Sequence, residues 1–153
     1  MNADMNQFRE VFFEESAEHV ASMEAALLAL ETDPDPAELL KQIFRSAHTI
    51  KGGSGMFGLS ELGRFTHTME NLLDRMRNGL IAPSAPLVSL LLRCCDTVKE
   101  LLAAARGGGP APRMLDEIVV VLDPQRASAT LRRADHVAAV PGAKVHHEIA
   151  CGH

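Results

Sequence analysis

The stretch FRSAHTIKGGSGMFG, residues 44–58, constrains this chain more than any other part of it. It begins as an amphipathic helix and then has glycine at positions 52, 53, 55 and 58. Each glycine inside a helix costs about 1 kcal/mol relative to alanine, so the first three together cost on the order of 3 kcal/mol if all are helical. A domain is stabilised by only about 5–15 kcal/mol in total. Local preferences are usually broken where function requires it, and the glycines therefore indicate a functional surface or a close approach.

The rest of the chain has the pattern of a helical bundle. Apolar residues recur at three- and four-residue steps in four segments, which begin near residues 4, 36, 60 and 86 and end near residues 31, 52, 77 and 105. The links between them are short, so neighbouring helices run antiparallel. The chain is 46% hydrophobic and has no Trp or Tyr, which suits helix packing. We expect an all-α, up-and-down four-helix bundle, with residues 114–122 as an additional C-terminal helix.

Some details of packing can be expected as well. In the first helix the pattern places Phe8 and Phe12 in the core, in line with Val20, Met23 and Leu27. Ser60 is a plausible N-cap for the third helix. Cys94 and Cys95 are expected to be small core residues of the fourth helix rather than metal ligands.

The organisation of the chain follows from these segments. We expect a bundle over residues 1–105, a linker and fifth helix over 106–123, and a tail or linker over 124–153. A net charge of −5 argues against nucleic-acid binding. No apolar run approaches the ~20 residues that a membrane span needs. Neither a signal peptide nor a disulfide framework is evident, which indicates a cytoplasmic protein.

His48 carries the chemical interest of the glycine-rich stretch. A helix advances about 100° per residue, which places His48 roughly 120° from the centre of the core stripe, at the edge of the solvent. The turn to the next helix is centred near Gly58, so residue 48 meets residues 67–70 across the hairpin. Glu70 is then placed to accept a hydrogen bond from one ring nitrogen of His48, which leaves the other as a free nucleophile. Lys51, one turn further on, is placed to pair with an anion attached to that nitrogen.

A neutral histidine, an orienting carboxylate and a nearby ammonium describe a phosphoryl acceptor. The sequence IKGGSG has its lysine before the glycines, not after them as a phosphate-binding loop requires. No cluster of acidic residues for Mg²⁺ is evident beside the histidine. We therefore expect no cofactor or metal in this chain, and ATP and Mg²⁺ to be used by a partner kinase domain.

The two sequences FRSAHTIKGGSGMFG and THTMENLLDRMRNG resemble the histidine phosphotransfer (HPt) domain family, in its chemotaxis branch. The resemblance is to the N-terminal domain of the chemotaxis sensor histidine kinase CheA, and it extends from FREVFFEE to about Leu102, two thirds of the chain. It implies that His48 is phosphorylated, that Glu70 holds its ring, and that Lys51 and His67 complete the hydrogen-bond network. All four positions match the family pattern.

The resemblance also implies partners. A kinase domain phosphorylates the histidine from ATP, and the phosphoryl group passes to an aspartate of a CheY-like response regulator. The chain itself is then a phosphoacceptor that belongs to a protein-histidine kinase, either as a fragment of a longer kinase or as a separate carrier. A surface around His48 is expected to dock these partners. Its predicted members are Phe44, Arg45, Gly52, Gly55, Met56 and Phe57.

Two alternatives remain open at this point. A helical bundle can bind a metal through histidine and carboxylate pairs, here through His48, His67 and Glu70, with His19 as a further ligand. The chain can also act as a docking adaptor that transfers no phosphate. Four further metal-binding side chains lie near the C-terminus, where we expect a tail without a fixed coordination geometry. They are His146, His147, Cys151 and His153.

Overall fold

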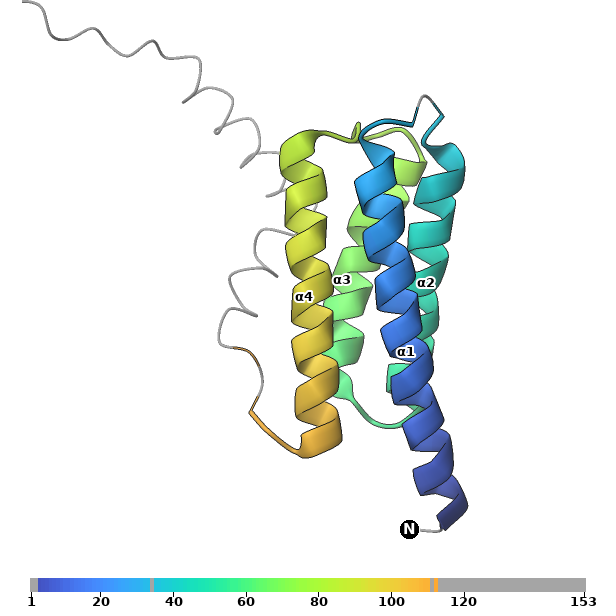
Figure 1. Cartoon of the computed structure of the whole chain (residues 1–153), viewed down its shortest axis with the longest axis vertical. Coiled ribbons are helices and arrows are strands. Elements are labelled where there is room, and N and C mark those ends of the chain that lie inside the picture. The colour runs from blue at the N-terminus through green and yellow to red at the C-terminus, as the bar shows by residue number, and fades with distance from the viewer. Residues whose placement is uncertain (1–2, 34, 111, 113–153) are drawn as a thin grey trace, which may run out of the picture.

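Four helices run alternately up and down, with neighbours in sequence packed side by side (Figure 1). The computed structural model describes residues 3–33, 35–110 and 112. Its helices are α1 (Ala3–Leu30), α2 (Ala37–Met56), α3 (Ser60–Arg77) and α4 (Ala85–Gly107), and the described residues include no strand. The expected four-helix bundle is confirmed. The additional helix expected at 114–122 and the tail from 124 lie outside the described residues. None of the described helices is long and apolar enough to cross a membrane.

The core runs the length of the bundle, and α1 shows how it is built. Its buried residues follow three- and four-residue steps, at positions 13, 16, 20, 23, 27 and 30, and Ala26 is buried beside them. The prediction was wrong for Phe8, which is 63% exposed. Phe12 is half-buried and packs against the core, whereas Phe13 lies within it. The N-terminal turns of α1 extend past the neighbouring end of α2 (Figure 1). Phe8, in the second turn of α1, lies outside the core cluster.

The helix α2 continues through its glycines to Met56 instead of ending at Gly52. The glycines differ in what surrounds them. A Cβ atom at Gly53 would overlap the ring of Phe12, which packs against the rings of Phe13 and Phe57 with centroids 5.5 and 5.3 Å away. A Cβ atom at Gly52 or Gly55 would meet nothing within 4 Å. Gly53 thus allows α1 to approach α2, and packing within the bundle does not account for the other two.

The N-terminus of α3 differs from the sequence prediction for Ser60. Ser60 is the first residue of α3, not its N-cap; Leu59 occupies the cap position and makes no side-chain cap. The turn is tight because Gly58 has φ +69° and Leu59 N–H donates to the carbonyl of Ser54 at 2.9 Å. At α4, the Ser84 hydroxyl accepts from Leu87 N–H. Cys94 and Cys95 are buried in α4 as predicted, and burial raises the pKa of both thiols.

The two classes of glycine predict opposite effects on stability. Gly52→Ala should raise the free energy of unfolding by about 1 kcal/mol, because alanine favours the helix and the new methyl group meets no neighbour. Gly53→Ala should lower it by about 1–2 kcal/mol, because the Phe12 ring must move out of its aromatic contacts. Urea denaturation followed by circular dichroism measures both. Equal effects of the two substitutions would contradict this assignment.

Candidate functional site

His48 lies on the outward face of α2, and its side chain is 61% exposed. Its Nδ1 atom lies 3.1 Å from Oε1 of Glu70, on the neighbouring helix α3. The Nζ atom of Lys51, one turn along α2, lies 2.8 Å from the other carboxylate oxygen of Glu70. The three residues that the sequence placed together are therefore in contact. Glu70 is the less accessible of the pair, with 12% of its side chain exposed, whereas the histidine faces water.

The protonation of Glu70 determines how the imidazole is held. Burial disfavours its charged form, but the hydrogen bonds from Lys51 and His48 outweigh burial and hold the pKa of Glu70 below its usual value. Glu70 is therefore ionised at neutral pH and can only accept hydrogen bonds. In the neutral ring of His48 the proton must then lie on Nδ1, which donates to Glu70. The lone pair of Nε2 is left free.

The short connection between α2 and α3 explains why these side chains meet. Phe57, Gly58 and Leu59 reverse the chain, so residues at similar distances from the turn lie at the same level of the bundle. Buried neighbours fix the rotation of both helices: Ala47 and Ile50 on α2, and Met69 on α3. With those residues turned inward, His48 and Glu70 reach the seam between the helices. The core packing thus sets the geometry of the site.

Phe44, which the sequence placed on the docking surface, and Arg77, which sequence reasoning missed, lie beside this group. Phe44 packs against His48 with ring centroids 6.1 Å apart and an interplanar angle of 12°. The Cζ atom of Arg77, from α3, lies 4.1 Å from the centroid of the Phe44 ring. Asp74 binds the same guanidinium, with Oδ1 2.8 Å from Nη2. The spacing of Glu70, Asp74 and Arg77 at i, i+4 and i+7 places them on one face of α3 and was the available signal.

His67 is not brought into the hydrogen-bonded group. It is exposed on α3, and the described residues give it no hydrogen bond or ion pair. Its expected part in the network stays a prediction.

The residues expected to dock a partner lie on the outside of α2, around His48 and beyond it. Arg45, Gly52 and Gly55 are exposed, and Met56 is 74% exposed. Phe44 and Phe57 are half-buried. The side-chain-free positions Gly52 and Gly55 follow His48 by one and two turns. The backbone of α2 is therefore bare on one side of the imidazole.

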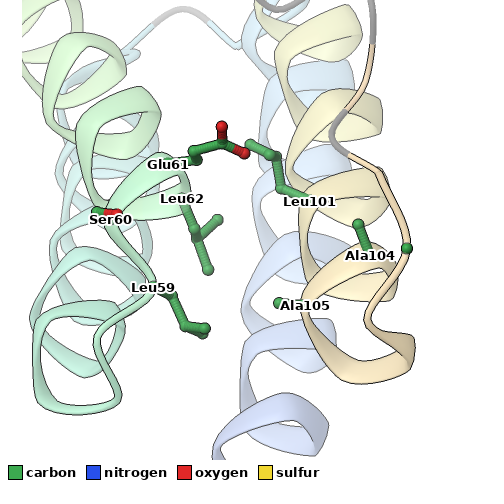
Figure 2. Close-up of a pocket in the computed structure, with 8 residues that line it drawn as sticks. Leu59, Ser60, Glu61, Leu62, Leu101, Ala104 and Ala105 are labelled. Carbon is green, nitrogen blue, oxygen red and sulfur yellow. The ribbon is translucent and has the colours of Figure 1, made fainter.

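No group of three or more histidine, cysteine, aspartate or glutamate side chains suited to hold a metal ion occurs among the described residues. His19 is half-buried on α1, and four further side chains, His146, His147, Cys151 and His153, lie outside the described part. A cavity of about 160 Å³ lies elsewhere, between the start of α3 and the end of α4 (Figure 2). Leu59, Leu62 and Leu101 line it, and His48 does not. A reactive side chain on an open face suits a protein partner better than a small substrate, which is usually enclosed.

A four-helix bundle that displays a carboxylate-held histidine beside a lysine and bare glycines has the features of a histidine phosphotransfer domain. Residues 7–108 match the family model of the Hpt domain. The match covers most of the described residues, and the chain belongs to the Hpt domain family.

Within this family the chain is similar to chemotaxis proteins named CheA. It is 37% identical to that of Bacillus subtilis over 82% of this chain and 19% of the relative. It is 42% identical to that of Rhizobium meliloti over 69% and 14%, respectively. It also resembles the phosphorylated P1 domain of CheA3 from R. sphaeroides, solved in complex with CheY6, with a TM-score of 0.66, 28% identity, and coverage of 82% of this chain and 97% of that one. The chain spans less than a fifth of the length of these CheA relatives.

The geometry predicts an uncommon tautomer for the neutral ring of His48. We expect the Nδ1–H form to predominate, because the ionised Glu70 accepts from Nδ1. Two-bond ¹H–¹⁵N correlation spectra of the imidazole distinguish the two tautomers. In Glu70→Ala the population should shift toward Nε2–H, while Glu61→Ala, an exposed glutamate on the same helix, should leave it unchanged. A predominant Nε2–H form in the unsubstituted protein would contradict the assigned hydrogen bond.

Proposed function

We propose that this chain is a phosphotransfer domain of a two-component chemotaxis pathway and that His48 is its phosphoacceptor. The observation that best supports this proposal is the contact between His48 Nδ1 and Glu70, which leaves Nε2 with a free lone pair on an exposed face. In the proposed reaction, Nε2 attacks the γ-phosphorus of ATP. The N–P bond forms as the bond to the bridging oxygen breaks and ADP leaves. In the second step an aspartate carboxylate of a regulator attacks phosphorus, and the N–P bond breaks.

Glu70 and Lys51 have complementary parts in this proposal. The ring gains positive charge when Nε2 bonds to phosphorus, because its Nδ1 proton stays in place. The ionised carboxylate of Glu70 lies 3.1 Å away and stabilises that charge. Lys51 lies on the same helix face as His48, one turn on, with 28% of its side chain exposed. Its ammonium group stabilises the phosphoryl oxygens, which bring negative charge to the same region.

The nucleotide and the catalytic machinery are proposed to come from a histidine kinase domain, with ATP and Mg²⁺ as its ligands. The similarity to CheA proteins supports this, and so does the open position of His48, which a second protein domain can approach. A CheY-like response regulator is the proposed acceptor, supported by the CheA3 P1 domain having been solved with CheY6. The pathway is expected to operate in the cytoplasm. The chain then acts as a phosphoacceptor within a protein-histidine kinase system and has no kinase activity by itself.

Labelling with radioactive ATP and a CheA-type kinase domain tests the proposal. The unsubstituted chain should acquire phosphate that is labile in acid and stable in base, as expected for an N–P bond. His48→Gln should remove the label because glutamine has no nucleophilic ring nitrogen. Circular dichroism should show an unchanged bundle, since residue 48 is exposed. Glu61→Gln, which changes an exposed side chain on α3 outside the site, is the control and should still accept phosphate at His48. Equal labelling of His48→Gln would refute the proposal, and binding of a regulator with no transfer from any variant would favour the docking adaptor.

The bare positions beside His48 should limit how closely a partner approaches. Gly52→Leu and Gly55→Leu place a side chain where the structure has open space, so the bundle should fold as before. Transfer from phosphorylated His48 to a receiver domain should fall at least about tenfold, because a displacement of the order of 1 Å at the reacting atoms already costs that much or more. Rapid-quench kinetics measure this rate. Ala103→Leu, an exposed substitution on α4, is the control, and transfer that is equally fast in all three variants would exclude close approach as the role of the glycines.

A further inference from the structure

This inference rests on the proposed phosphoacceptor role of His48. We propose that Arg77 is a positioning residue for that reaction and that it acts through the ring of Phe44. The guanidinium of Arg77 covers Phe44, and Phe44 in turn packs against the imidazole of His48. The ring of His48 is then held at two places, by Glu70 at Nδ1 and by Phe44 against its face.

The His48–Glu70 contact, Phe44 and Arg77 lie at successive levels along the bundle axis. Phe44 precedes His48 by four residues on α2, about 6 Å of helix rise, and Arg77 follows Glu70 by seven residues on α3, about 10 Å. Because the helices are antiparallel, both displacements point toward the same end of the molecule. Starting from the level of the His48–Glu70 contact, Phe44 comes first and Arg77 comes after it. Arg77 therefore reaches His48 through the phenylalanine.

Each contact in this series has the geometry of a stabilising interaction. Ring centroids 6.1 Å apart with planes 12° from parallel are within the range of offset stacking. A guanidinium 4.1 Å from a ring centroid lies well within cation–π distance. Asp74 fixes the guanidinium through an ion pair with Nη2 at 2.8 Å. A half-buried phenylalanine that is covered in this way samples fewer rotamers and presents a steadier surface to the imidazole.

The second point of support has a specific consequence. A hydrogen bond at Nδ1 alone fixes the distance to Glu70 but allows the plane of the ring to swing, and this swing moves Nε2. Packing against Phe44 restricts this rotation of the ring plane. The lone pair of Nε2 then points in one fixed direction, toward the solvent. Arg77 is a positioning residue and not a catalytic one, because Asp74 already pairs with its charge and Phe44 comes between it and the imidazole.

A double-mutant cycle tests the series, with Phe44→Leu, Arg77→Gln and the double variant. Labelled ATP and a CheA-type kinase domain give kcat and KM for each chain as phosphoacceptor. Arg77→Gln should lower kcat by about two- to fivefold, as expected from a cation–π interaction of about 0.5–1 kcal/mol, and should leave KM unchanged. The double variant should match Phe44→Leu alone, since Arg77 has no effect once the ring is absent. Arg64→Gln, an exposed arginine on the same helix, is the control.

A spectroscopic measurement on the free chain accompanies the kinetics. The ring current of Phe44 shifts the carbon-bound protons of the His48 imidazole, and this shift should decrease in Arg77→Gln while Arg64→Gln leaves it unchanged. Additive kinetic effects in the cycle, a change in KM alone, or an unchanged ring-current shift would each overturn the positioning role. If the unsubstituted chain shows the shift but accepts no phosphate, the proposed function itself fails, and the role of the stack in transfer fails with it.

Discussion

The contact between His48 and Glu70 across the seam of α2 and α3 is the interaction on which the rest of the site depends. It requires that the two helices are aligned along their axes and that the core residues of each are turned inward. A rotation of either helix by one residue, about 100°, would separate the pair. The hairpin of residues 57–59 supplies that alignment. The packing of the bundle core thus specifies the orientation of one exposed imidazole.

Packing and access make opposite demands on the same turns of α2, and the glycines satisfy both. Gly53 faces α1, where its missing side chain admits the ring of Phe12. Gly52 and Gly55 face solvent, where the missing side chains leave the backbone bare. The aromatic contacts of Phe12 with Phe13 and Phe57 help to offset the weak helix propensity of this segment. A helix with three glycines therefore persists to Met56, beyond the histidine that it presents.

The sequence was sufficient for the architecture and for the centre of the site, and it failed where long side chains or the ends of helices decide the outcome. Four periodic segments define four helices, and counting from the turn places Glu70 beside His48. Periodicity alone did not distinguish Phe12 from Phe13, because either residue continues the three- and four-residue steps to Ser16 and Val20. It also did not show that Phe8 is exposed. Arg77 escaped notice because a cation–π contact between helices depends on side-chain reach as well as on the face of the helix. Ser60 has a common N-cap side chain, but the tight turn at Gly58 begins the helix one residue earlier.

The charges around the imidazole suit a group that must both accept and release a phosphoryl group. Lys51 and His48 together keep Glu70 ionised in spite of its burial, so the carboxylate is ready before the ring becomes charged. In the proposed transfer, Nδ1 keeps its proton in both directions, and the N–P bond forms and breaks at Nε2 without a proton leaving the ring. The site then needs no general base and no reorganisation of buried charge at either step. Its contribution is a fixed orientation and a fixed compensating charge, and both persist whether the ring is free or phosphorylated. The partners must therefore supply the groups that distinguish the forward step from the reverse one.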